Sequence, residues 1–217
     1  MHSQKWITHP RRLLLAVVIP SLVLAGILVA LLFGPTTAQA GGLQLQSGSA
    51  LFSTLDGSAS DLDGAADGSL TLERLDLSGN ATIVIDRGAV RFAVSGPMVL
   101  AGTSAIRPAA GMTEGPRIEI QAESIRLLGN ATVLADGESS GGELKLCATG
   151  NIEIGGRAVV SASAKNATGV GGSIHLEAGN RLIIQDAAAT VKANGGSGGE
   201  ITMITCSPAL GSSLGDA

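Results

Sequence analysis

Apolar and polar residues alternate strictly in three short segments of the C-terminal half, and a glycine opens each segment. A second pattern, Ala-x-Val-x-Ala, precedes each of them, and a glycine-rich stretch lies between the two patterns. The alternating segments are residues 142–146, 172–176 and 199–203, and the Ala-x-Val-x-Ala segments are residues 131–135, 158–162 and 189–193. Alternation with a period of two predicts half-buried β-strands, and its recurrence predicts a solenoid of stacked coils.

A glycine-led turn marks the length of each predicted coil. Such turns recur near residues 79, 102, 129, 156 and 187, so one coil contains about 23 to 31 residues. Stacking aligns equivalent apolar residues into an interior ladder, which we expect to contain Leu144, Ile174 and Ile201. The outward positions are expected to stay in water, namely Glu143, Lys145, His175, Glu177 and Thr202.

The pattern divides the chain into four regions. Residues 1–40 are predicted to be a signal peptide or a signal anchor, and the turn-rich residues 41–68 a polar linker or an N-terminal cap. Residues 69–206 are predicted to form the solenoid and residues 207–217 a flexible tail. The predicted fold class is therefore all-β, after one N-terminal hydrophobic helix.

The export signal lies in residues 13–33, an apolar run without a charge that follows basic residues. Its 21 residues are long enough to span a bilayer as a helix, and the basic residues before it predict that the following chain is exported. Ala38 and Ala40 form an Ala-x-Ala signal-peptidase site. Cleavage after Ala40 would release the protein, whereas an uncleaved run would anchor it in the membrane. Both alternatives place the remainder outside the cytoplasm, in the periplasm, on the outer surface or in the medium.

The amino-acid composition limits the kinds of binding partner that we expect. The chain has 31 glycines and 45% hydrophobic residues but only 2% aromatic residues, which suits a narrow, repetitive interior. The formal net charge is −4, and no basic patch interleaved with aromatic residues follows residue 40, so nucleic acid is not an expected partner. One coil separates Cys147 from Cys206 in the repeat, about 9–10 Å at strand spacing, so both are expected to remain free thiols.

No catalytic, metal or cofactor site is predicted. His175 lies between two inward residues and should face solvent, with no base or nucleophile beside it in the sequence pattern. Asp61 and Asp63 supply oxygen ligands of the kind that calcium prefers. Their spacing fits neither an EF-hand nor a calcium-binding nonapeptide repeat, so we interpret them as solvated turn residues.

Residues 171–184 resemble a repeat of the filamentous-haemagglutinin-type adhesins. They read Gly-Gly-Ser-Ile-His-Leu-Glu-Ala-Gly-Asn-Arg-Leu-Ile-Ile, and Ala-x-Val-x-Ala and Gly-Gly-Ser-Gly-Gly follow. The similarity covers residues 115–205 and, more loosely, residues 69–114. This resemblance implies a right-handed parallel β-helix and a role in adhesion.

Two other functions compete with this one. Residues 75–83 and 118–122, behind an N-terminal anchor, are similar to periplasmic lipopolysaccharide-transport proteins, which implies a lipid-handling jelly roll with a groove. A polysaccharide-acting enzyme on a parallel β-helix is a weaker hypothesis, because sugar sites use aromatic platforms and only Phe52 and Phe92 remain after residue 40.

These features favour a non-catalytic β-helix of the cell envelope or surface, with a structural or adhesive role and no cofactor. Its membrane contact would be residues 13–33, if they are not cleaved. No amphipathic capping helix follows residue 205, and an uncapped last strand offers unpaired backbone groups to another chain. We therefore expect self-association or a β-protein partner at the C-terminal coil, and we expect proline at Thr202 to abolish it.

Overall fold

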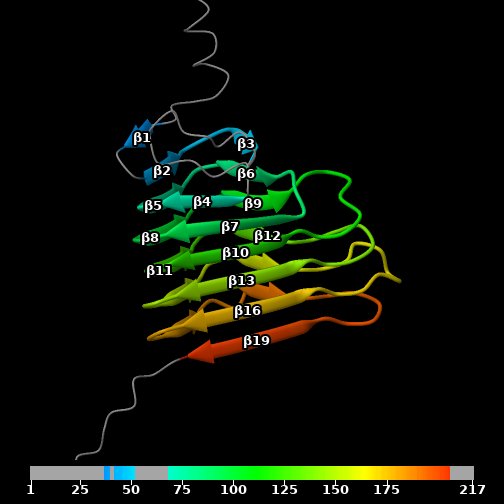
Figure 1. The fold of residues 1–217 in the computed structure, drawn as a ribbon. Helices are drawn as coiled ribbons and strands as arrows, with labels where there is room; N and C mark the ends of the chain where they lie inside the picture. The colour runs from blue at the N-terminus through cyan, green and yellow to red at the C-terminus, as the bar shows by residue number, and fades with distance from the viewer. Residues whose placement is uncertain (1–36, 40–41, 52–67, 206–217) are drawn as a thin grey trace, which may run out of the picture.

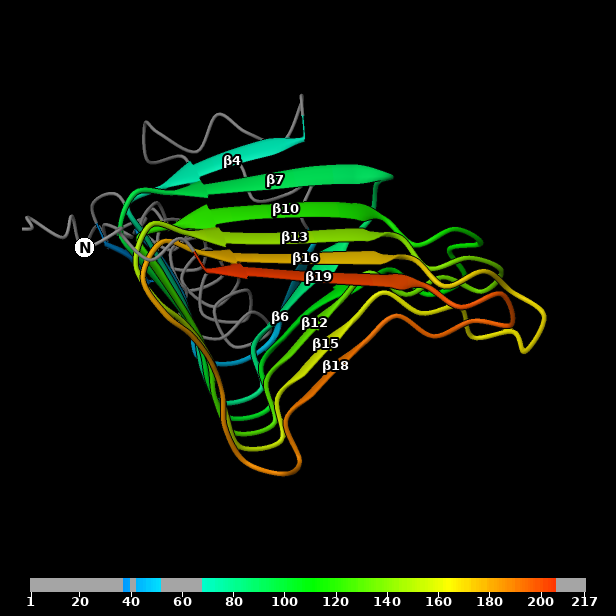
Figure 2. The ribbon, with the colours of Figure 1, turned by 90° about the horizontal axis from the view of Figure 1, so that it is seen from below.

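The computed structural model describes residues 37–39, 42–51 and 68–205, which form nineteen β-strands and no helix. They build a parallel β-solenoid with five complete coils of three strands each (Figure 1). Viewed along the stack, the three walls of the solenoid enclose a triangular cross-section (Figure 2). The all-β solenoid predicted from the alternating pattern is thus confirmed.

Three sheets, named walls A, B and C, form the sides of the solenoid. Within each coil the chain passes through wall C, then wall A, then wall B. Wall A contains β1 (Thr37–Gln39), β2 (Gly42–Leu45), β5 (Arg74–Leu77), β8 (Pro97–Leu100), β11 (Ser124–Leu127), β14 (Ile152–Ile154) and β17 (Leu182–Ile184). Wall B contains β3 (Ser49–Leu51), β6 (Thr82–Ile85), β9 (Ala105–Pro108), β12 (Thr132–Leu134), β15 (Val159–Ser161) and β18 (Thr190–Lys192). Wall C contains β4 (Ser69–Leu72), β7 (Ala89–Val94), β10 (Arg117–Ala122), β13 (Glu143–Ala148), β16 (Ser173–Ala178) and β19 (Glu200–Thr205).

Strand pairing between coils is parallel throughout the described residues, except where β1 runs antiparallel to β2. A jelly roll is built from antiparallel strands, so the described residues do not have that architecture. Parallel, in-register pairing places residues of one kind above one another, coil after coil. The interior is therefore a set of ladders rather than an irregular core.

The ladder predicted from the sequence lies in wall C. Leu144 pairs with Ile174, which pairs with Ile201. Leu144 and Ile174 are buried, with 0% and 1% of their surface exposed, whereas Ile201 is 42% exposed. No described coil follows β19, so the last residue of the ladder is covered on one side only. Burial of an Ile or Leu side chain stabilises a fold by about 1.5–3 kcal/mol, so the inner coils gain most from these ladders.

Left-handed residues turn the chain from wall A to wall B. Gly79, Gly102, Gly129 and Gly156 have φ between 61° and 74° and stack on one another. A Cβ on Gly102 would lie 2.7 Å from the carbonyl oxygen of Gly79, so only glycine fits there. In the fifth coil the left-handed residue is Asp186, with φ of 76°, one position before the turn expected near residue 187.

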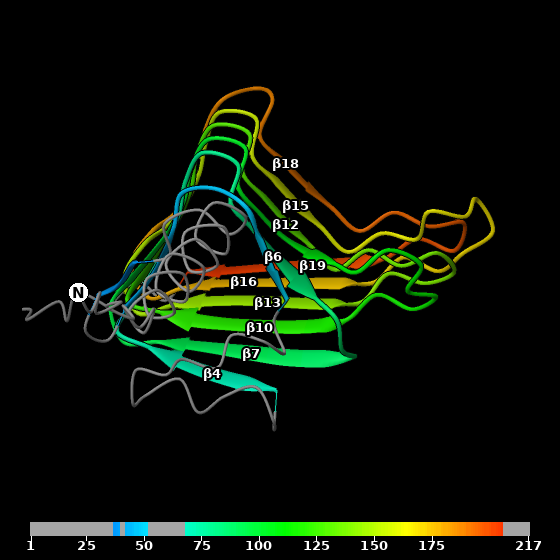
Figure 3. The same ribbon diagram turned by 90° about the horizontal axis from the view of Figure 1, so that it is seen from above.

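Longer loops turn the chain from wall B back to wall C. They span residues 109–116, 135–142, 162–172 and 193–199, and they project together from one corner of the triangle (Figure 3). Isolated parallel bridges join neighbouring loops, such as Ser140 to Val170. The loop of residues 162–172 is the longest of these four, and Gly171 and Gly172 lie where it joins β16.

The described residues cover only part of the four predicted regions. Ala38 lies in β1, whereas Ala40 and residues 13–33 fall outside the described residues. Within residues 41–68, β2 and β3 already stack on β5 and β6, so parallel pairing begins upstream of Ser69. The tail of residues 207–217 and Cys206 are also outside the described part. Among the described residues, no helix has the length and apolarity needed to cross a membrane.

Candidate functional site

The outward face of wall C is formed by the longest strands of the described walls. Its strands from β7 onward are six residues long, and every second side chain points away from the interior. These outward residues form three rows along the stack. The rows are Ala89, Arg117, Glu143, Ser173 and Glu200; then Arg91, Glu119, Lys145, His175 and Thr202; then Ala93, Gln121, Cys147, Glu177 and Ile204.

Polar side chains of the wall C surface bind one another, both across neighbouring coils and within one strand. Arg91 Nη2 donates a 2.8 Å hydrogen bond to Gln121 Oε1, and Gln121 Nε2 donates a 2.9 Å bond to Glu119 Oε1. Arg117 Nε lies 3.5 Å from Glu143 Oε2. These are exposed or half-buried pairs, each of which contributes at most about 1 kcal/mol, but together they order the surface.

His175, Glu177 and Cys147 meet in the middle of this surface. His175 Nε2 lies 3.3 Å from Glu177 Oε2, and Cys147 Sγ lies 3.9 Å from the same oxygen. Partial burial raises the pKa of the Cys147 thiol above its ordinary value; Lys145 opposes the rise, and the negative charge of Glu177 adds to it. A thiol that resists ionisation is a poor nucleophile, because the thiolate is the reactive form. The arrangement therefore suits a structural thiol rather than a catalytic one.

A second polar cluster lies where wall B meets the projecting loops, and it was not predicted from the sequence. Asp136 Oδ1 accepts hydrogen bonds from Ser161 Oγ at 2.6 Å and from the backbone amide of Ser163 at 2.7 Å. Ser163 Oγ in turn accepts a 3.0 Å bond from the amide of Asn194. Ser161 is fully buried. The cluster links three successive loops, and a buried polar network that is fully bonded fixes one arrangement.

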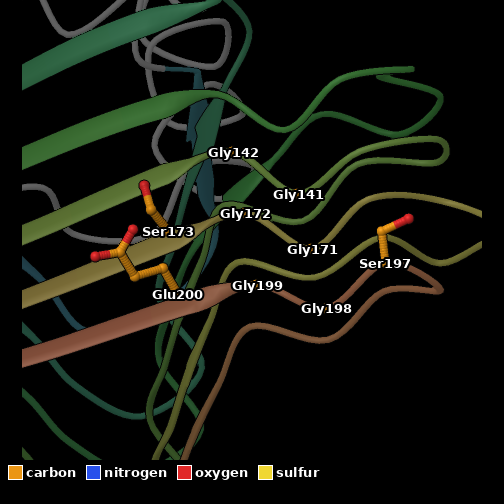
Figure 4. A pocket seen from close by; sticks show the side chains of 9 residues that line it. All are labelled: Gly141, Gly142, Gly171, Gly172, Ser173, Ser197, Gly198, Gly199 and Glu200. Atoms are coloured by element: carbon orange, nitrogen blue, oxygen red, sulfur yellow. The ribbon is translucent and has the colours of Figure 1, made fainter.

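Glycines of three successive coils line an open hollow of about 470 Å³ beside the start of β13, β16 and β19 (Figure 4). Its lining consists of Gly141, Gly142, Gly171, Gly172, Ser173, Ser197, Gly198, Gly199 and Glu200. The coils approach closely here, since a Cβ on Gly172 would lie 2.0 Å from the carbonyl oxygen of Gly142.

The hollow offers few free backbone donors to a ligand. The amides of Gly141, Gly142 and Gly172 bond to the carbonyls of Val170, Ala135 and Ala162 respectively. Ser173, Ser197 and Glu200 are the lining side chains with polar groups (Figure 4). The glycines are thus explained by the close packing of loops, and the hollow is their consequence.

Within the described residues, no group of three or more His, Cys, Asp or Glu side chains is placed to hold a metal ion. Asp61 and Asp63 lie outside the described part of the chain. Comparisons with protein-family models, with curated proteins and with solved structures found no match.

Proposed function

We propose that this chain is a non-catalytic β-helix of the cell envelope or cell surface, with a structural or adhesive role. The observation that carries the proposal is the wall C surface, on which outward side chains of successive coils bind one another. Equivalent positions repeat there at the strand spacing of about 4.8 Å. A stiff, periodic surface suits an extended or repetitive partner, because many weak contacts then add in avidity.

The location follows from the export signal. Residues 13–33 carry the chain out of the cytoplasm and either anchor it or are removed after Ala40. The adhesin-like repeats of residues 115–205 agree with a surface role. A right-handed winding is part of this proposal, since parallel strands joined by crossover connections are almost always right-handed.

Fractionation of cells that express the full chain tests the location. We expect the protein in an extracytoplasmic fraction, with an N-terminus at Gly41 if it is released or at Met1 if it is anchored. Full-length protein confined to the cytoplasm would contradict the proposal.

Adhesion of beads coated with the full chain to cell-surface polysaccharide and to matrix protein tests the role. Lys145→Glu reverses a charge in the middle of the wall C surface, and Arg107→Glu reverses one on the exposed side of wall B. We expect Lys145→Glu to reduce adhesion and Arg107→Glu to leave it unchanged. Equal loss in both variants would contradict wall C as the binding surface.

Native mass spectrometry of the same purified protein separates this function from lipid handling. The proposal predicts no stoichiometric lipid. One bound lipid per chain would instead support the lipid-handling alternative.

A further inference from the structure

Strand β1 is the one described strand whose pairing is antiparallel only. It covers the outer edge of β2, at the N-terminal end of wall A (Figure 1). Three residue pairs join the two strands, namely Thr37 with Gln44, Ala38 with Leu43 and Gln39 with Gly42. The chain therefore reverses its direction between β1 and β2 before it enters the first coil.

Alternate residues of β2 supply the backbone groups that face β1. The carbonyl of Leu45 accepts a hydrogen bond from the amide of Ser78, so the backbone groups of Leu45 point towards β5. Backbone directions alternate along a strand, so Leu43 also points towards β5, whereas Gly42 and Gln44 point towards β1. The amide of Gln44 thus belongs to the pairing with β1 and not to the pairing that joins β2 to the solenoid.

Strand β1 also contains part of the predicted signal-peptidase site. Ala38 lies in β1, whereas Ala40 and Gly41 connect β1 to β2 and lie outside the described residues. A peptidase that reads small side chains two positions apart needs an extended chain, in which every second side chain points to the same face. Because β1 and β2 are antiparallel with only two residues between them, the chain cannot be extended through this site while the strands are paired.

We infer that β1 is a protective strand, whose pairing with β2 shields the bond between Ala40 and Gly41 from signal peptidase. Hydrolysis of this bond adds one water molecule and leaves a carboxylate on Ala40 and an amino group on Gly41. The covalent tether between the two strands is then lost, and three residue pairs are too few to keep β1 on β2 without it.

Folding and cleavage therefore compete for the same segment. A chain in which β1 pairs with β2 before the peptidase acts stays anchored by residues 13–33. A chain that is cleaved first is released without β1, so β2 loses the strand that covers Gly42 and Gln44. The inference rests on the export signal of the proposed function, and it adds what decides between the anchored and the released form.

Proline at position 44 tests the protection by β1. Gln44→Pro removes an amide on the β1 side and keeps those on the β5 side, whereas the matched control Gln44→Thr keeps every amide. Full chains purified in mild detergent are incubated with a signal peptidase, and the N-terminus of the product is sequenced. We expect Gln44→Pro to be cleaved before Gly41 about tenfold faster than the parent and Gln44→Thr, because proteolysis follows the population of the open form. Cleavage of Gln44→Pro that is no faster than that of the other two chains, including no cleavage at all, would overturn the inference.

A reversible disulfide between the paired strands provides a second test that leaves the fold intact. Thr37→Cys and Gln44→Cys are introduced together, with Cys147 and Cys206 replaced by serine. The Cα atoms of a hydrogen-bonded antiparallel pair lie about 5.5 Å apart, within the reach of a disulfide. We expect oxidation to slow cleavage about tenfold and reduction to restore it, with all products reduced before electrophoresis. Cleavage that reduction does not increase would overturn the inference.

Both reactions use purified protein, so their rates do not depend on where the cell places the chain. Confinement of the full chain to the cytoplasm would contradict the proposed location and leave these rates unaffected. Equal rates in an exported chain would overturn the protective role of β1 and leave the proposed location intact.

Discussion

Asp186 lies next to Gly156 in the stack of corners between walls A and B, and its Oδ2 atom accepts a 2.6 Å hydrogen bond from the Gly156 amide. Asp186 is also the one non-glycine residue with a positive φ among the described residues. The side chain thus supplies a backbone partner at the last described corner between walls A and B, and the left-handed conformation holds that side chain in place.

Substitutions of Asp186 should separate the contribution of its hydrogen bond from that of its left-handed backbone conformation. We expect Asp186→Ala to lower the free energy of unfolding by about 1–2 kcal/mol, because alanine is strained in the left-handed region. Asp186→Asn keeps an oxygen acceptor and tolerates this conformation, so its loss should be smaller. Urea unfolding measures both, and hydrogen exchange at the Gly156 amide should be faster in the alanine variant. Equal stability of the two variants would contradict this account.

At the corners between walls A and B, Ser104 occupies a position where the neighbouring coils have a buried alanine. Its equivalents in neighbouring coils are Ala81, Ala131 and Ala158, all fully buried. Ser104 is also fully buried, and its hydroxyl has no hydrogen-bond partner among the described residues. We expect Ser104→Ala to raise the free energy of unfolding by about 1 kcal/mol, because an unsatisfied hydroxyl is removed from the interior.

The reverse change, Ala131→Ser, is the matched control, and it should lower stability by a similar amount. Urea midpoints of the two variants should therefore move in opposite directions. If Ser104→Ala is destabilising, the hydroxyl has a partner and the interpretation is wrong.

Ile174 and Ile201 belong to the same interior ladder but are buried to different extents. Alanine substitutions at the two positions should therefore lower the free energy of unfolding by different amounts. Ile174→Ala should cost about 2–5 kcal/mol, as usual for a buried aliphatic residue. Ile201→Ala should cost less than half as much at concentrations where the chain is monomeric, because Ile201 is already 42% exposed. Thermal or urea unfolding measures both costs. Equal costs would mean that the end of the ladder is covered within one chain.

The repeating part of this fold could be predicted from the sequence because each coil has the same residue types at equivalent positions. Alternation identified the inward ladder, and glycine identified the corners at Gly79, Gly102, Gly129 and Gly156. The corner in the fifth coil was predicted only to within one residue, near 187 instead of Asp186, because no glycine marks it and aspartate adopts the left-handed conformation less readily than glycine.

The cluster around Asp136 was missed for a related reason. Its hydrogen-bond partners are 25 and 27 residues away in sequence and meet it only through the stacking of loops. An Asp-Gly pair in a loop is an ordinary turn signal, so the residues alone do not distinguish a solvated turn from a half-buried residue that holds several loops together.

Alkylation of Cys147 should depend on the charge of Glu177. Burial raises the pKa of this thiol, Lys145 lowers it, and Glu177 raises it further, so the protein carries less thiolate near pH 8 than a free cysteine would. Glu177→Gln should speed the reaction with iodoacetamide, and Lys145→Gln should slow it. Both are measured in a Cys206→Ser background, with the unfolded protein as the reference. An unchanged rate in Glu177→Gln would contradict the electrostatic interpretation.

The central claim is that coils stack in parallel and in register, so that Cys147 lies opposite Glu177 across a 30-residue coil. Single cysteines at three outward positions of β16, introduced as Ser173→Cys, His175→Cys and Glu177→Cys in the Cys206→Ser chain, measure this register by their rates of intramolecular disulfide formation with Cys147. Opposed strands are about 4.8 Å apart, within the Cα reach of a disulfide, and each two-residue step along the strand adds distance. The account predicts the fastest link at position 177, a slower one at 175 and the slowest at 173. A maximum at 175 or 173, or equal rates at all three, would contradict it.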